Sequence, residues 1–173
     1  MTGIAASLSI LALVAAMAGC AMRRTGAMGA MTVVQGLCVA GALLASTNVL
    51  PALLVAVLGA AAMPWSVGTL LPAATRSAES WPVVAAGLIG AAVAVTVPEV
   101  GLALALLWVG LWQVTMRPAA AERVLALVTM QNGIVLAAVA HPGAPLAWTV
   151  LAALPIPAGV LLVGLRPPGR GLA

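Results

Sequence analysis

Seven apolar runs follow one another along this chain, and only short breaks separate them. Each break contains a charge, a proline or a turn former, the residue types at which helices end. Because about 20 apolar residues span the hydrocarbon of a bilayer, runs of this length predict membrane-spanning helices. The runs cover residues 4–22, 28–47, 50–71, 81–97, 99–116, 122–140 and 145–165.

The composition favours the same interpretation. Of the 173 residues, 64% are hydrophobic and 6% are charged, which is far from the composition of a soluble domain. The high isoelectric point, about 11.2, reflects the scarcity of acids rather than a basic patch, so it does not support nucleic-acid binding. Cys20 and Cys38 lie within apolar runs, where reduced thiols pack as small hydrophobic groups.

The distribution of arginine predicts the topology. If the N-terminus lies outside, alternate connections fall on the cytoplasmic side, and these hold all seven arginines. By the positive-inside rule, this predicts an all-α polytopic membrane protein of about seven transmembrane helices with a cytoplasmic C-terminus. The alternative to a division at Pro98 is one long kinked helix from 81 to 116, but such a helix exceeds the length that one span needs. The arginines are Arg23, Arg24, Arg76, Arg117, Arg123, Arg166 and Arg170.

Two adjacent side-chain amides, Gln131 and Asn132, stand in the middle of the sixth run. Lipid offers them no hydrogen bonds, and adjacent helical residues point about 100° apart, so protein must flank this helix on more than one side. Gln35 lies at a similar depth in the second run. It either bonds to the Gln131-Asn132 pair across a helix interface or bonds separately to backbone carbonyls. These three amides are the candidates for helix packing or for lining a water path.

Titratable groups are absent from the predicted membrane interior. Glu79, Glu99, Glu122 and His141 all fall near predicted interfaces, whereas a proton carrier in a membrane needs such a group at depth. Glu122 and Arg117 are candidates for a cytoplasmic proton entrance, although an acid in the first helical turn also favours the helix dipole.

The sequence contains no recognisable nucleophile, metal cluster or phosphate-binding loop. We therefore predict no catalytic, cofactor-binding or metal-binding residues. Gln113, one turn before Arg117, is expected to reach toward the membrane interface.

The second half of the chain carries a recognisable pattern. An Ala/Leu-rich helix from Gly101 is followed by Arg117 and, fourteen residues later, by Gln131-Asn132-Gly133-Ile134. This resembles the hydrogenase-4 component E family, in which a cytoplasmic arginine precedes a helix bearing Glu-Asn-Gly-Ile or a close variant. In the first half, Arg23-Arg24 followed by Gln35 is similar to the second helix of that family. Met63-Pro64-Trp65, with Arg76 beyond, is similar to its third.

The resemblance implies a seven-helix or similar subunit in the membrane arm of hydrogenases related to respiratory complex I. The chain would form one membrane domain with a four-helix part (residues 1–97), a part similar to the complex I K subunit (98–165) and a cytoplasmic tail (166–173). Gln131 stands where the family has a glutamate, Gly59 where it has a lysine, and the acids of its last helix are missing. Each difference removes a titratable group.

These features predict a non-catalytic structural subunit of a complex-I-like energy-converting hydrogenase or related respiratory complex, which does not itself carry protons. It would lie in the bacterial cytoplasmic (inner) membrane, without a cofactor, against larger antiporter-like and hydrogenase-like subunits. The alternative is a small polytopic transporter or a subunit of a multisubunit cation/proton antiporter. A transporter is expected to have a midplane binding site built from several helices, for which the three amides are few.

Cysteine labelling tests the predicted topology. Cysteines introduced at Ser77 and Arg170 should react from the cytoplasmic side, and those at Glu99 and His141 from the outside, because seven spans separate the arginine-bearing connections from the others. Labelling of positions 77 and 141 from the same side would contradict this arrangement.

Overall fold

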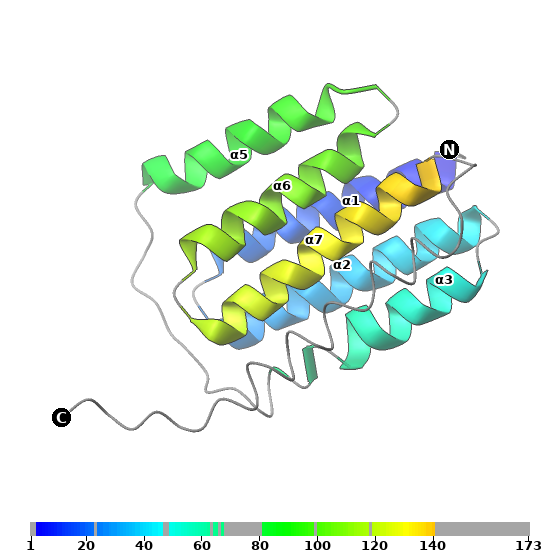
Figure 1. Ribbon diagram of the computed structural model, residues 1–173, viewed down its shortest axis with the longest axis horizontal. Coiled ribbons are helices and arrows are strands. Elements are labelled where there is room, and N and C mark those ends of the chain that lie inside the picture. The colour runs from blue at the N-terminus through cyan, green and yellow to red at the C-terminus, as the bar shows by residue number, and fades with distance from the viewer. Residues whose placement is uncertain are drawn as a thin grey trace.

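The computed structural model describes residues 3–22, 24–46, 49–62, 64–65, 67, 81–98, 100–117 and 119–140. The elements in these residues are all helices, so the predicted all-α class is confirmed (Figure 1). They are α1 (Gly3–Ala21), α2 (Thr25–Ala45), α3 (Val49–Leu54), the π-helix η1 (Val55–Ala62), α5 (Trp81–Val95), α6 (Gly101–Met116) and α7 (Ala120–Ala140).

The helix bounds follow the predicted runs closely for α1, α2, α5, α6 and α7. The alternative of one long kinked helix is wrong, because α5 ends at Val95 and α6 begins at Gly101 and runs back along it (Figure 1). A Cβ at Gly101 would overlap the carbonyl oxygen of Val95, so this tight reversal needs glycine. The predicted seventh helix, 145–165, lies outside the described residues.

Four helices form a closed ring in the order α1, α2, α7, α6, with each packed against the next. Figure 1 shows that α1 and α6 run in one direction and that α2 and α7 run in the other. Helix α5 is added on the outside of α6, and α3 and η1 lie along α2. Helix α7 therefore has protein on two sides, and the ring draws on both predicted parts of the chain, 1–97 and 98–165.

The contact between α6 and α7 depends on two glycines. A Cβ at Gly133 would lie 2.6 Å from the backbone nitrogen of Leu107 and 2.8 Å from the carbonyl oxygen of Ala103. A Cβ at Gly110 would lie 2.5 Å from the backbone nitrogen of Met130. Because these neighbours are backbone atoms, a side-chain rotation could not make room. Two helices that approach this closely gain dispersion contacts along their backbones.

A pair of tryptophans holds α5 against α6. The indole Nε1 of Trp108 donates to the carbonyl oxygen of Gly87 at 3.2 Å, and the rings of Trp108 and Trp112 stack with centroids 6.4 Å apart. A Cβ at Gly87 would come within 2.6 Å of the Trp112 ring, and a Cβ at Gly90 would overlap the Trp108 ring. The two glycines thus form a flat surface for the two indoles.

The third predicted run differs from a simple helix. After six residues of α-helix it continues as the eight-residue π-helix η1, which ends just before Met63 and Pro64. Proline lacks an N–H and its ring crowds the carbonyl four residues earlier, here that of Ala60, so the chain before Pro64 cannot keep ordinary α-helical bonding throughout. Ala60 also lies against α2, because a Cβ at Gly36 would be 2.8 Å from the Ala60 Cβ.

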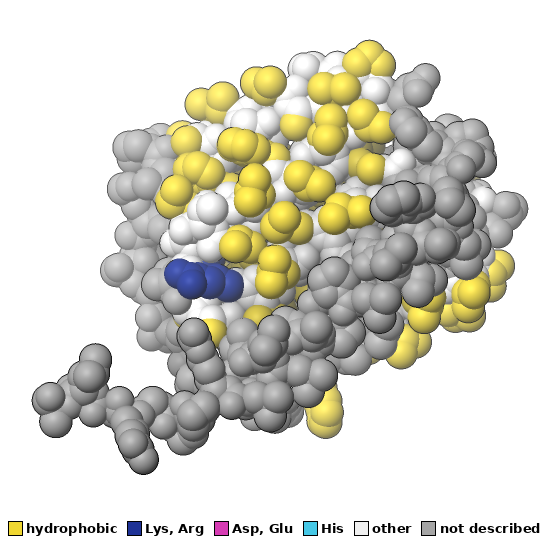
Figure 2. All heavy atoms as spheres, in the orientation of Figure 1, with side chains coloured by type: hydrophobic (Ala, Val, Ile, Leu, Met, Phe, Trp, Pro, Cys, Tyr) yellow, Lys and Arg dark blue, Asp and Glu magenta, His cyan; other side chains and the backbone are white. Residues whose placement is uncertain are grey.

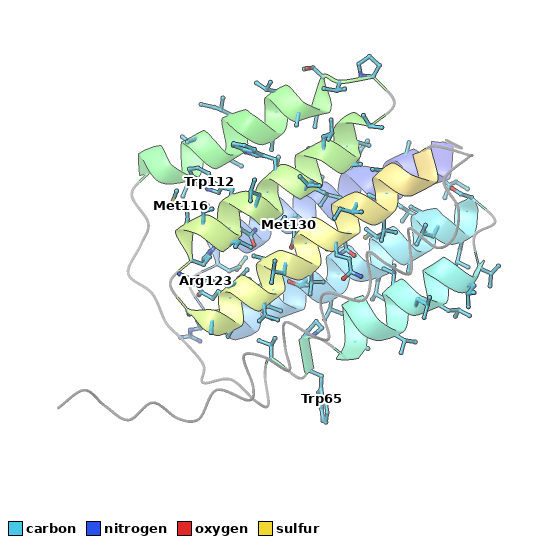
Figure 3. All side chains as sticks on the ribbon, in the orientation of Figure 1. Trp65, Trp112, Met116, Arg123 and Met130 are labelled. Carbon is cyan, nitrogen blue, oxygen red and sulfur yellow. The ribbon has the colours of Figure 1, made fainter. Side chains whose placement is uncertain are left out.

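The outer face of the bundle is apolar. Figure 2 shows hydrophobic side chains across the visible described surface, with a basic patch where Figure 3 labels Arg123. By length and composition alone, α1 and α2 are long and apolar enough to cross a membrane, and residues 84–95 and 101–116 form shorter apolar helices. Outward-facing side chains that are more than half exposed include Ile4, Leu11, Val14, Leu37, Leu53, Trp65, Ile89 and Val93.

Replacing Gly133 with alanine should separate α6 from α7. We expect a loss of about 1–3 kcal/mol in the free energy of unfolding, because the new methyl group meets backbone atoms. Gly26→Ala is the matched control: a Cβ at Gly26 has nothing within 4 Å, so better helix propensity should make this change neutral or stabilising. Denaturant titration in detergent, followed by circular dichroism, measures both. Equal stabilities of the two variants would contradict the close α6–α7 contact.

Candidate functional site

The described charged side chains gather at one end of the bundle. Helices α1 and α6 end there, and α2 and α7 begin there (Figure 1). Arg24 precedes α2, Arg117 follows α6, and Glu122 and Arg123 stand in the first turn of α7. This is the end that the sequence predicts to be cytoplasmic.

Arg117 caps the C-terminus of α1 although it belongs to the end of α6. Its Nη2 donates to the carbonyl oxygens of Gly19 at 3.1 Å and Cys20 at 2.7 Å, and its Nη1 donates to that of Met22 at 3.3 Å. The last carbonyls of a helix have no partners within the helix and form the negative end of its dipole. A buried guanidinium therefore satisfies them, and Arg117 is only 2% exposed.

Glu122 completes this arrangement from α7. Its Oε2 lies 3.8 Å from Nη1 of Arg117, and both side chains are 1% exposed. The carboxylate stands at the positive end of the α7 dipole, as the sequence suggested, and it also balances the buried guanidinium. The pair joins the ends of α1, α6 and α7.

Glu122 and Arg117, the two residues predicted as candidates for a proton entrance, lie beside each other in the structure. Both side chains lie inside the described part of the protein and in contact with each other. Arg123 next to them is exposed, and its Nε donates to the carbonyl oxygen of Arg117 at 2.7 Å. Arg123 thereby holds the short connection between α6 and α7.

The central amides lie on α2 and α7. Gln35 is 1% exposed, and its Oε1 accepts a hydrogen bond from the Thr129 hydroxyl at 3.1 Å. Asn132 is 2% exposed and lies one turn beyond Thr129, whereas Gln131 is half-buried and points about 100° away from Asn132. The structure thus brings Gln35 to the predicted helix, with a hydroxyl as its partner.

Sequence reasoning did not single out Thr129. The two predicted arrangements were a bond between Gln35 and the amide pair and separate bonds to backbone carbonyls. In the structure Gln35 instead accepts a hydrogen bond from the Thr129 hydroxyl. A buried threonine within a helix usually bonds to its own backbone, as Thr129 also does with the carbonyl oxygen of Leu125 at 3.3 Å. The sequence did contain a signal for Thr129: it stands three residues before Asn132, and residues at this spacing share one face of a helix.

Its position near the end of α6 led us to expect Gln113 to reach toward an interface, but the structure places it in the interior. It is 2% exposed, and its Nε2 donates to the Ala16 carbonyl oxygen at 3.2 Å and to Sγ of Cys20 at 3.0 Å. The expectation was wrong because the glutamine faces α1 and is buried between the two helices. Gln113 and Arg117 together bind the last two turns of α1.

Comparison with protein families, with characterised proteins and with solved structures finds no match. The site is therefore interpreted from its own geometry. Among the described residues, no group of three or more His, Cys, Asp or Glu side chains is placed to hold a metal ion. The buried amides and hydroxyls can donate and accept hydrogen bonds, but they do not bind or release protons near neutral pH.

The Arg117–Glu122 pair predicts unequal effects of single substitutions. Arg117→Met should destabilise the protein by about 3–5 kcal/mol, because it leaves Glu122 buried without its counter-charge and removes the α1 cap. Glu122→Gln should have a smaller effect, since Arg117 keeps three carbonyl acceptors. The double variant should be less destabilised than the sum of the two single variants.

Thermal or denaturant unfolding of the purified protein in detergent measures this coupling. Arg123→Met is the control for loss of a charge at the same end of the bundle, because Arg123 is exposed. Additive effects in the double variant, or an Arg117→Met effect no larger than that of Arg123→Met, would show that the buried pair does not stabilise the fold.

Proposed function

We propose that this chain is an integral membrane subunit without catalytic residues of its own, and that it packs within the membrane arm of a complex-I-like energy-converting hydrogenase or a related respiratory complex. One observation carries the membrane part of the proposal: large apolar side chains cover the outside of the bundle, while amides, hydroxyls and an ion pair lie inside it.

This distribution favours lipid as the surrounding medium. Soluble monomers rarely expose contiguous apolar patches larger than a few hundred Å², whereas exposed isoleucine, leucine and valine side chains here occur on α1, α2, α3, α5, α6 and α7. Several hydroxyls are satisfied within their own helices, as when Ser9 donates to the Ala5 carbonyl oxygen at 2.8 Å and Thr32 donates to that of Met28 at 3.0 Å. Such internal pairing is needed where the solvent offers no hydrogen bonds.

The orientation we propose follows from the arginines. Arg24, Arg117 and Arg123 occupy the same end of the alternating helices. The positive-inside rule then supports a multi-pass protein in a bacterial inner membrane, with this end in the cytoplasm, the N-terminus outside and the C-terminus in the cytoplasm.

The described polar side chains support a packing role over transport. Gln113 connects α6 to α1, and Gln35 connects α2 to α7. Gly133, within the Gln131-Asn132-Gly133-Ile134 motif, lies at a close backbone contact between α7 and α6. The motif that resembles hydrogenase-4 component E thus contains a residue with a clear role in helix packing.

The hydrogenase assignment rests on the sequence resemblance, which implies larger antiporter-like and hydrogenase-like membrane subunits as partners. The glutamine in place of the family's glutamate supports a subunit that does not itself carry protons. A small transporter, or a subunit of a multisubunit cation/proton antiporter, is the alternative that the following experiment distinguishes.

The chain should be tagged in its native host, and its membranes should be washed with alkaline carbonate and then solubilised in a mild detergent. We expect the protein to stay with the carbonate-washed membranes and to purify in a particle far larger than its own 17.0 kDa, with stoichiometric iron. Mass spectrometry should identify antiporter-like and hydrogenase-like subunits.

A second preparation in a harsher detergent is the control, because it should release the chain and separate it from the iron. Release by carbonate would overturn the membrane assignment. A metal-free monomer or dimer in mild detergent would favour the transporter, and a large metal-free assembly of antiporter subunits would favour the antiporter alternative.

A further inference from the structure

Among the described residues, two side-chain amides in the interior of the bundle have a donor nitrogen without a hydrogen-bond partner in the protein. The Nε2 of Gln35 and the Nδ2 of Asn132 are fully buried, and neither makes a hydrogen bond with the protein. The side chains are 1% and 2% exposed, so bulk solvent does not reach them. Leaving a buried donor unused is unfavourable, and native proteins usually satisfy such groups with ordered water.

Thr129 lies between the two groups in the sense that it bonds to Gln35 and shares a helix face with Asn132. The Thr129 hydroxyl is 3.1 Å from Oε1 of Gln35, and the unused Nε2 is bonded to the same carbon as that oxygen. Asn132 follows Thr129 by three residues, and residues at this spacing on a helix have Cβ atoms about 5–6 Å apart. One small molecule beside Thr129 is therefore within reach of both amides.

We propose that Gln35, Thr129 and Asn132 bind an internal water molecule between α2 and α7. The water accepts one hydrogen bond from Nε2 of Gln35 and another from Nδ2 of Asn132. The Thr129 proton already points to Gln35 or to the Leu125 carbonyl oxygen, so its oxygen is available to accept a hydrogen bond from the water. About three such bonds are typical of a buried water.

Water fits this site better than an anion. A half-turn of either amide exchanges its nitrogen and oxygen, and water satisfies both orientations because it donates as well as accepts. An anion would only accept, and it would need a nearby positive charge. Among the described residues the arginines lie at the end of the bundle, where Arg117 already binds carbonyl oxygens and Glu122.

A third element, η1, lies near this part of α2 and α7. Gly36, the neighbour of Gln35 on α2, lies against Ala60 of η1, and η1 also packs against α7. The proposed water thus lies between α2 and α7, in a region where η1 also packs against both helices. This inference does not depend on the proposed function, because it follows from the unused donors of the described residues alone.

Water-to-amide magnetisation transfer tests the proposal. The full chain, labelled with nitrogen-15 in detergent micelles, is examined by nuclear Overhauser measurements in the laboratory and rotating frames, which separate a bound water from proton exchange. We expect transfer from water to the side-chain amides of both Gln35 and Asn132. The backbone amide of Leu106, which is fully buried in α6, provides the dry reference.

Substitutions show whether the two amides share one water. Asn132→Leu should reduce the transfer to Gln35 toward the dry reference, and Gln35→Leu should do the same for Asn132. Gln131→Leu is the matched control, since the half-buried Gln131 is adjacent to Asn132 but points elsewhere, and it should leave both signals unchanged.

Absence of transfer to both amides in the unsubstituted protein would overturn the proposal whether or not the variants fold. Transfer to one amide alone, or to both with no effect of either substitution, would also overturn the shared site. Because these readouts do not involve partner subunits, their failure is distinct from failure of the proposed function.

Discussion

A buried arginine determines how the helix ends come together. Arg117, at the C-terminal end of α6, binds the last carbonyl oxygens of α1, and Glu122 at the start of α7 lies beside it. In a medium of low dielectric, charges and unpaired carbonyls are both unfavourable, so the guanidinium binds the carbonyl oxygens and the carboxylate supplies its counter-charge. The positions of α1, α6 and α7 at this end depend on that arrangement. Arg123 adds a hydrogen bond to the carbonyl oxygen of Arg117 and so stabilises the connection between α6 and α7.

Along the bundle, by contrast, small residues determine the spacing. Gly110 and Gly133 allow the backbones of α6 and α7 to touch, whereas Gly87 and Gly90 receive indole rings from α6. The same residue type thus makes two different contacts. Both contacts bring neighbouring helices close enough for extensive dispersion contact.

The polar interior links packing to the proposed role. Gln113 and the Gln35–Thr129 pair each join two helices across the ring. Their hydrogen bonds restrict how the helices rotate and slide, because moving either helix would leave a buried amide without a partner. The packing role that we propose for this chain would benefit from such rigidity. The water that we infer at Gln35 and Asn132 would add a second polar link between α2 and α7, beside the Gln35–Thr129 hydrogen bond.

The sequence by itself determined the helical class and most helix bounds, because apolar runs broken by proline, glycine and charge leave few other ways to satisfy a backbone. It also placed the important amides on α2 and α7. It did not determine their partners, since Thr129 and Gln113 reveal their roles only when two helices are rotated and aligned in depth. The glycine contacts at Gly110 and Gly133 were likewise invisible among many Gly and Ala residues. Nor could spacing show that Arg117 serves the end of α1, almost one hundred residues earlier along the chain. Tertiary structure decided these points because helix rotation, depth and neighbour choice depend on long-range packing, which a local pattern does not encode.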